Sequence, residues 1–138
     1  MLQGIHPLLI GRLLSELDAA GHSDGVLVAD AHFPAARLAA RLIELPGTTA
    51  PEVVAAICTV LPIDDFGGAP GLELMASADG RVHEVQRELM DAAGIGESGT
   101  RFVDRFDFYD VAREAFVIIR TGEVRSYGNA ILRKGLIG

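Results

Sequence analysis

Apolar residues along this chain follow two spacings, one typical of helices and one typical of short buried strands. Four segments carry the helical spacing, and each has a capping residue at one end. Gly21 and Gly94 suit helix C-termini, because glycine adopts the left-handed conformation without strain. Thr49 and Glu52 form a capping box, and Asp107 is an expected N-cap. The predicted helices cover residues 7–20, 49–61, 82–93 and 107–114.

The remaining apolar runs are short enough to be strands. They cover residues 26–30, 72–77, 101–104, 115–120 and 129–134. The segment 34–45 is ambiguous, because its alanines and arginines favour a helix, whereas residues 41–45 alternate like a half-buried strand. Since helices and buried strands alternate, the pattern predicts an α/β fold in a single domain over residues 1–138. We expect a three-layer α/β/α sandwich around a mixed, largely parallel sheet.

Composition and charge narrow the possible partners. The formal net charge is −7, which is unfavourable for binding nucleic acids and anionic membranes, because both require a basic face. Apolar residues make up 49% of the chain, yet Trp is absent, so the core is expected to consist of Ala, Val, Leu and Ile. The positive mean hydropathy of so small a domain indicates apolar surface buried between copies, and we expect a homo-oligomer.

The single cysteine, Cys58, excludes an intramolecular disulfide and a cysteine-based zinc site. It lies in an apolar helical pattern and is expected to be a small buried apolar residue. The chain shows no secretory signal pattern and no apolar run of membrane-spanning length. We therefore expect a cytoplasmic protein.

Four polar side chains flank the strand predicted at residues 26–30, namely those of His22, Asp24, Asp30 and His32. Burying such groups costs free energy unless they are hydrogen-bonded or take part in ligand binding or catalysis. His22 follows a helix C-terminus, whose dipole favours the protonated imidazole, so it is a candidate general acid–base catalyst or a capping residue. Asp30 lies at the carboxyl end of the strand, where α/β sheets bind ligands, although it could instead cap the next segment. Asp24 suits a turn. His32 could join His22 and Asp30 in a metal site.

Two later segments combine polar and aromatic residues. Arg105 lies among phenylalanines and could direct its guanidinium into a pocket, or pair at the surface with Asp104 or Asp107. The segment Ser126–Asn129 is a polar kink before an apolar strand. Its tyrosine and asparagine suit hydrogen bonds to a sugar, and Gly128 permits close approach of the backbone. The same segment could also be an ordinary hairpin turn.

Taken together, these motifs resemble the L-fucose mutarotase and D-ribose pyranase family over essentially the whole chain. The matching segments are Met1–Leu9, Gly21–Asp24, Asp30–Pro34, Arg105–Tyr109 and Tyr127–Asn129. The last three are more similar to the fucose mutarotase branch than to the ribose pyranase branch. The resemblance also favours a strand, rather than a helix, at residues 41–45.

The resemblance implies an isomerase that needs no cofactor or metal. Such an enzyme interconverts the anomers of a monosaccharide, L-fucose or a similar sugar, by acid–base-assisted ring opening. The resemblance further implies decameric rings with sites near the subunit interfaces. It assigns His22 as the catalytic proton donor, and the residues it assigns to sugar binding are Asp30, Arg105, Tyr127, Gly128 and Asn129.

Two departures from the family leave the identity of the sugar open. Asp104 stands where a neutral amide is expected, and Ser126 stands where a larger polar residue is common. Three alternatives to an anomer mutarotase remain. The first is a D-ribose pyranase-type enzyme that exchanges pyranose and furanose rings. The second is a non-catalytic sugar-binding or regulatory protein. The third is a metal-dependent enzyme that binds its metal with His22, Asp30 and His32.

Overall fold

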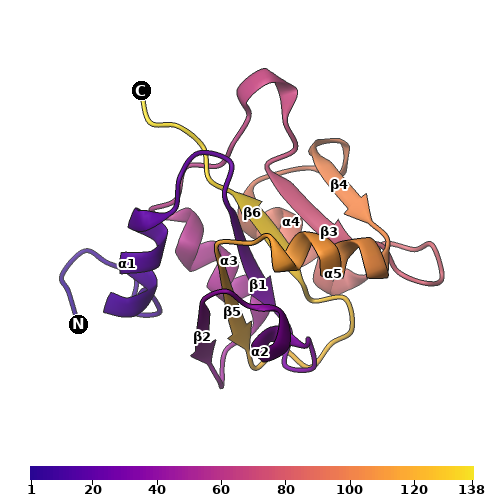
Figure 1. The fold of residues 1–138 in the computed structure, drawn as a ribbon, viewed down its shortest axis with the longest axis horizontal. Coiled ribbons are helices and arrows are strands. Elements are labelled where there is room, and N and C mark those ends of the chain that lie inside the picture. Colours follow the sequence, from indigo (N-terminus) through magenta and orange to yellow (C-terminus); the bar gives the residue numbers. More distant parts are fainter.

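Six strands form one mixed sheet with helices on both of its faces (Figure 1). The computed structural model describes all residues from 1 to 138. The strands are β1 (Gly25–Ala29), β2 (Leu42–Leu45), β3 (Leu72–Met75), β4 (Thr100–Val103), β5 (Val117–Thr121) and β6 (Ala130–Arg133). Their order is β2-β5-β1-β6-β3-β4, and β6 alone runs against the other five. The predicted mixed, largely parallel sheet is confirmed.

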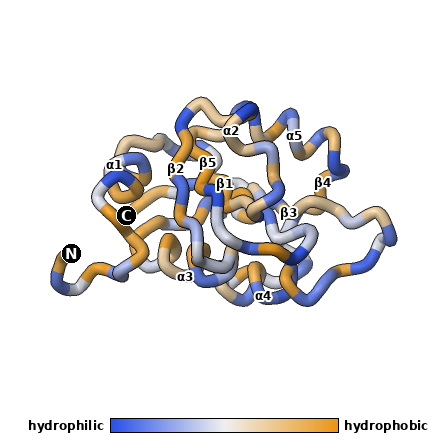
Figure 2. Tube along the Cα trace, turned by 90° about the horizontal axis from the view of Figure 1, so that it is seen from below, coloured by the Kyte–Doolittle hydropathy of each residue, from blue (hydrophilic) through white to orange (hydrophobic).

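Helices cover both faces of the sheet. The α-helices are α1 (Gly11–Ala19), α2 (Ala35–Leu38), α3 (Ala50–Cys58), α4 (Glu84–Ala93) and α5 (Arg105–Arg113), with short 3-10 helices η1 (Phe66–Gly68) and η2 (Glu97–Gly99). Successive strand residues point to opposite faces: Val26 and Val28 of β1 pack with α1, α3 and α4, whereas Leu27 and Ala29 pack with α2 and α5. Figure 2 shows α2 and α5 above the strands and α3 and α4 below them. The predicted three-layer sandwich is confirmed.

Local capping explains where several helices begin and end. Thr49 accepts a hydrogen bond from the backbone N–H of Glu52, and the Glu52 carboxylate accepts one from the backbone N–H of Thr49, so the predicted capping box of α3 is confirmed. Gly94 ends α4 in the left-handed conformation, with φ of 68°. The predicted start of α5 was wrong. Asp104 holds the N-cap position, and Asp107 lies in the first turn, where its charge is favourable to the helix dipole.

Two boundaries differ from a reading of local propensity, namely the conformation of residues 34–45 and the start of the first helix. Residues 35–38 form α2, and the chain then continues into β2, which pairs in parallel with β5. The strand expected at residues 41–45 is therefore confirmed to within one residue. The first helix begins at Gly11, four residues later than predicted, because residues 6–10 form turns closed by their own backbone hydrogen bonds.

Cys58 lies at the end of α3, half-buried and packed against the core rather than fully buried. Burial raises the pKa of its thiol to about 11, so the thiol stays neutral and weakly nucleophilic at physiological pH. No helix in the structure is both long enough and apolar enough to cross a bilayer.

Candidate functional site

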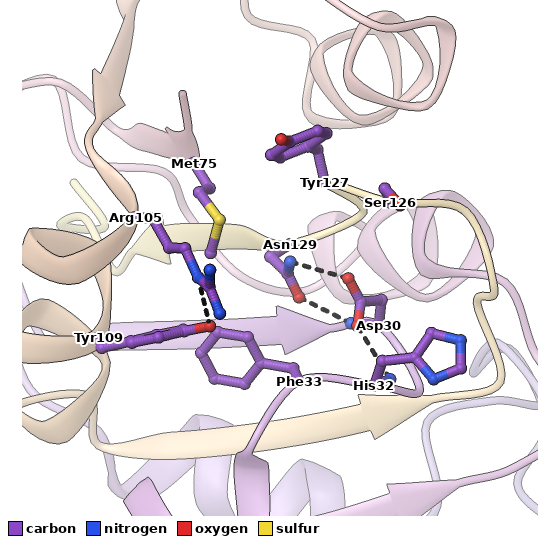
Figure 3. Close-up of a pocket in the computed structure, with 9 residues that line it drawn as sticks. All are labelled: Asp30, His32, Phe33, Met75, Arg105, Tyr109, Ser126, Tyr127 and Asn129. Carbon is purple, nitrogen blue, oxygen red and sulfur yellow. Dashed lines mark hydrogen bonds between the residues drawn. The ribbon is translucent and has the colours of Figure 1, made fainter. Parts of the chain in front are cut away.

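A cavity of about 290 Å³ opens at the carboxyl end of β1, between the loop after that strand, the start of α5 and the segment before β6. This is the edge of an α/β sheet where ligands are expected. Figure 3 shows the nine residues that line it. Four of the residues assigned to sugar binding are among them, and Gly128 lies between two of these. The lining residues are Asp30, His32, Phe33, Met75, Arg105, Tyr109, Ser126, Tyr127 and Asn129.

Asp30 and Asn129 form a reciprocal hydrogen-bonded pair beside the cavity (Figure 3). The backbone N–H of Asp30 donates to Asn129 Oδ1 at 2.8 Å, and Asn129 Nδ2 donates to Asp30 Oδ2 at 2.9 Å. The other carboxylate oxygen accepts the backbone N–H of His32 at 3.0 Å. Asp30 is only 6% exposed, and this burial raises its pKa above the ordinary value, although the hydrogen bonds act in the opposite direction. The cavity therefore contains a desolvated carboxylate of fixed orientation.

Tyr127 is held in a constrained conformation in the segment before β6. Its φ is 66°, a region that residues other than glycine rarely adopt. Its hydroxyl accepts the backbone N–H of Ala78 at 3.0 Å, and its ring centroid lies 5.0 Å from that of His83. A Cβ at Gly128 would lie 2.8 Å from Glu123 Cγ. Since β6 pairs with β1 and β3 and not with β5, the segment is not a hairpin turn.

Glu123 anchors this segment through both its buried carboxylate and its backbone carbonyl. Glu123 accepts hydrogen bonds from the backbone and guanidinium of Arg125 and from the backbone N–H of Ala50. Burial raises the pKa of Glu123, but the interactions with Arg125 outweigh that effect and leave the pKa below its ordinary value. The Glu123 carbonyl also accepts the backbone N–H of Ala31 at 2.8 Å. The two loops that border the cavity are thus tied to each other.

Arg105 lines the cavity from the first turn of α5. Its Nε donates to the hydroxyl of Tyr109 at 3.1 Å, one helical turn further on (Figure 3). This hydrogen bond raises the pKa of Arg105, which stays charged. Neither Asp104 nor Asp107 forms an ion pair with it, so the structure favours the pocket over the surface pair. Both terminal nitrogens of the guanidinium remain available to a ligand.

Three apolar or aromatic residues of the cavity are not among those assigned to the site from the sequence. Tyr109 follows Arg105 by four residues, a spacing that places both on one helical face. Phe33, whose ring centroid lies 5.6 Å from that of Tyr109, belongs to the motif that follows Asp30. No sequence pattern identifies Met75 as a site residue, because its place in the cavity depends on β3 lying near α5.

His22 lies at the opposite end of β1 from this cavity. It belongs to the turn between α1 and β1, near the loop that carries η1, and both lie at the top of Figure 1. The four steps from Gly25 to Ala29 alone span about 13 Å at about 3.3 Å per residue. The ring of His22 points to Asp64, with 3.0 Å between Nε2 and Asp64 Oδ1. Within one chain, the structure does not bring His22 to Asp30.

The other two polar residues near β1 have separate positions. Asp24 Oδ2 accepts the backbone N–H of Gly21 at 2.7 Å, so its expected role in the turn is confirmed. His32 lines the cavity next to Asp30. Because His22 lies at the far end of the strand, the three residues considered for a metal site do not meet within one chain.

Comparisons with known proteins identify the family and agree with the overall fold. The sequence pattern of the RbsD / FucU transport protein family matches residues 3–137. The L-fucose mutarotase of Haemophilus influenzae (strain PittGG) is 35% identical over 140 residues, which cover 99% of this chain and 97% of the relative. The crystal structure of the fucose mutarotase from Streptococcus pneumoniae in complex with L-fucose has a TM-score of 0.89 at 29% identity, covering 99% of this chain and 100% of the other. FucU from Bifidobacterium longum has a TM-score of 0.87 at 28% identity, with the same coverage.

Proposed function

Because this chain belongs to the RbsD / FucU transport protein family, we propose that it is a monosaccharide mutarotase, an isomerase that interconverts the α and β anomers of L-fucose or a similar sugar. The family expected from the sequence is thereby confirmed. One observation carries the proposal for the activity: a buried carboxylate, its amide partner and a free guanidinium converge on one cavity. The cavity volume lies at the lower end of the range for small-molecule sites, which suits a single sugar ring.

The cavity offers matching partners for a sugar that carries several hydroxyls. The carboxylate of Asp30 accepts hydrogen bonds, and the terminal nitrogens of Arg105 donate them. The hydroxyl of Tyr127 already accepts the backbone N–H of Ala78, so its own proton is free for a sugar oxygen. The ring of Phe33 provides an apolar wall for the C–H face of the sugar. Gly128 and Asn129 act indirectly, by holding Tyr127 and Asp30 in place.

Anomer exchange requires one proton to reach the ring oxygen while the anomeric hydroxyl loses another. The bond between the anomeric carbon and the ring oxygen then breaks, the free aldehyde rotates, and the ring closes on its other face. We assign proton donation to the His22 imidazolium and proton acceptance to Asp30, whose pKa is raised by burial. Closure returns both protons, so no cofactor is consumed. Assistance of this kind gives about 10²–10⁴-fold acceleration.

His22 is able to reach a sugar in this cavity only when it comes from a second copy of the chain, because the cavity of the same chain lies at the other end of β1. We therefore propose a homo-oligomer, with the decameric ring implied by the sequence resemblance as its form and each site completed at a subunit interface. The exposed apolar side chains support association. They include Met1, Leu2, Ile10, Phe66, Leu136 and Ile137.

A cytoplasmic location is part of the same proposal. So is the absence of nucleic-acid and membrane partners, because the net charge of −7 is unfavourable to both.

Saturation-transfer NMR on free sugars tests the activity directly. The protein should accelerate exchange between the anomers of L-fucose, and His22→Gln should abolish the acceleration while the folded spectrum is kept. Acceleration of pyranose–furanose exchange in D-ribose, without an effect on L-fucose, would instead assign a ribose pyranase. Sugar binding without any faster exchange would make the protein a sugar-binding protein and overturn the proposed reaction.

A further inference from the structure

His22 is engaged on one side by a carboxylate that no motif in the sequence singled out. Its Nε2 lies 3.0 Å from Oδ1 of Asp64, 42 residues further along the chain. The Asp64 side chain is 5% exposed, whereas the imidazole of His22 is 37% exposed. The ring also packs edge-on against Phe66, with centroids 5.8 Å apart. The imidazole thus has one edge on a buried acceptor and another edge open to solvent.

The loop that carries Asp64 is fixed to the end of β6. The backbone N–H of Asp64 donates to the carbonyl of Arg133 at 2.9 Å, and Ile63 forms an isolated antiparallel bridge with Lys134. The carboxylate oxygen that faces His22 also accepts the backbone N–H of Phe66 at 3.1 Å. These bonds determine the direction of the carboxylate before any ligand arrives.

Asp64 is ionised at neutral pH. The hydrogen bond from His22, followed by that from Phe66, lowers the pKa of its carboxyl below the ordinary value. An ionised carboxylate only accepts hydrogen bonds. The proton of this contact therefore lies on Nε2 of His22, and Nδ1, which makes no hydrogen bond within the chain, is the free nitrogen.

The other charged groups around this turn have hydrogen-bond partners other than the His22 ring. Asp24 accepts the backbone N–H of Gly21. Lys134 donates to three carbonyls at the C-terminal end of α1. Arg133 pairs with the buried carboxylate of Glu73. Asp64 is thus the one charged group that is hydrogen-bonded to the His22 ring.

We propose that Asp64 is a positioning residue that fixes the orientation and tautomer of His22, so that Nδ1 is the nitrogen that exchanges a proton with the sugar. The inference rests on the proposed mutarotase function and deepens it by assigning the reacting atom. A carboxylate that orients a catalytic imidazole also stabilises the imidazolium formed during proton transfer. Asp64 acts through His22 and touches no substrate itself.

Asp64→Asn tests this role, because asparagine has nearly the same shape but carries no negative charge, so it stabilises the imidazolium less and does not require the proton to lie on Nε2. We expect the turnover number for anomer exchange to fall by at least about tenfold, with KM changed by less than about threefold, and to fall no further than in His22→Gln. The double variant His22→Gln/Asp64→Asn should be no slower than His22→Gln alone. Asp65→Asn removes the exposed neighbouring carboxylate and should behave as the wild type.

Long-range ¹H–¹⁵N NMR of the imidazole, recorded without sugar, supplies a readout that a purely structural role would not change. The wild-type protein should show neutral His22 protonated on Nε2, and this form should lose its dominance in Asp64→Asn. A wild-type His22 protonated on Nδ1, or an Asp64→Asn variant with full turnover, would overturn the inference. If the wild type accelerates no sugar, the proposed function itself fails, whereas the NMR result still reports whether the two side chains are paired.

Discussion

The separation between His22 and the Asp30 cavity predicts that two inactive variants will restore each other. His22→Gln removes the proton donor, and Asp30→Asn removes the carboxylate at the other end of β1. If each site takes His22 from one chain and Asp30 from another, mixed oligomers contain sites in which both residues are wild type. If a site belonged to one chain, no site in the mixture would have both.

The expected recovery follows from counting. In an equal mixture with random assembly, half of the chains carry wild-type His22 and half carry wild-type Asp30, so about one quarter of two-chain sites are intact. The geometry requires two chains, since β1 alone separates the two ends by about 13 Å. Each variant alone should lose most of the acid–base acceleration, which is about 10²–10⁴-fold.

The assay is saturation-transfer NMR on L-fucose after the two variants are unfolded together and refolded, or co-expressed with different tags. Native mass spectrometry shows whether mixed oligomers have formed. The matched control mixes wild-type chains with the double variant His22→Gln/Asp30→Asn. This mixture should keep about one quarter of the activity for a shared site and about one half for a single-chain site. Proven mixed oligomers without recovered activity would refute the shared site.

Other substitutions test the loops and charges around the cavity. Glu123→Gln should lower the free energy of unfolding at pH 7 by about 1.5–3 kcal/mol, because bonds to a charged group are lost. Folding lowers the pKa of Glu123, so its stabilisation is present above the unfolded pKa of about 4.5 and disappears as the pH falls through the lower folded pKa. In urea unfolding, the difference in free energy of unfolding between variant and wild type should therefore shrink in acid. A difference that stays constant with pH would contradict this. Asn129→Ala should move the acidic limb of kcat/KM to higher pH, because the amide N–H stabilises the Asp30 carboxylate, and a limb that stays in place would argue against Asp30 as the base. Gly128→Ala should weaken sugar binding in an NMR titration, since its Cβ would lie 2.8 Å from Glu123 Cγ. Gly96→Ala, whose Cβ would have no neighbour within 4 Å, should leave the affinity unchanged. Equal affinities in the two variants would show that the segment before β6 accommodates the added methyl group without moving Tyr127.

Local features of the sequence predicted most of the elements, because helix caps and hydrophobic periodicity act within a few residues. The capping box at Thr49 and the glycine stop at Gly94 are examples. The start of α5 was predicted three residues from its observed N-cap, because Asp104 and Asp107 are both acceptable near a helix N-terminus. Residues 41–45 needed tertiary information, since their strand conformation depends on pairing with β5.

In the candidate site, too, some features follow from the sequence and others only from tertiary contacts. Asp30, Arg105 and Asn129 could be chosen from the sequence, because a carboxylate at the end of a buried strand and motifs that resemble a known family are visible in a single chain. The sequence by itself thus determined the α/β class, the family and the chemical groups available. Only the tertiary structure decided which groups meet: the direction of β1 separates His22 from Asp30, and the loop after α3 brings Asp64 against His22. Such pairings depend on strand direction and sheet order, which no local spacing of residues encodes.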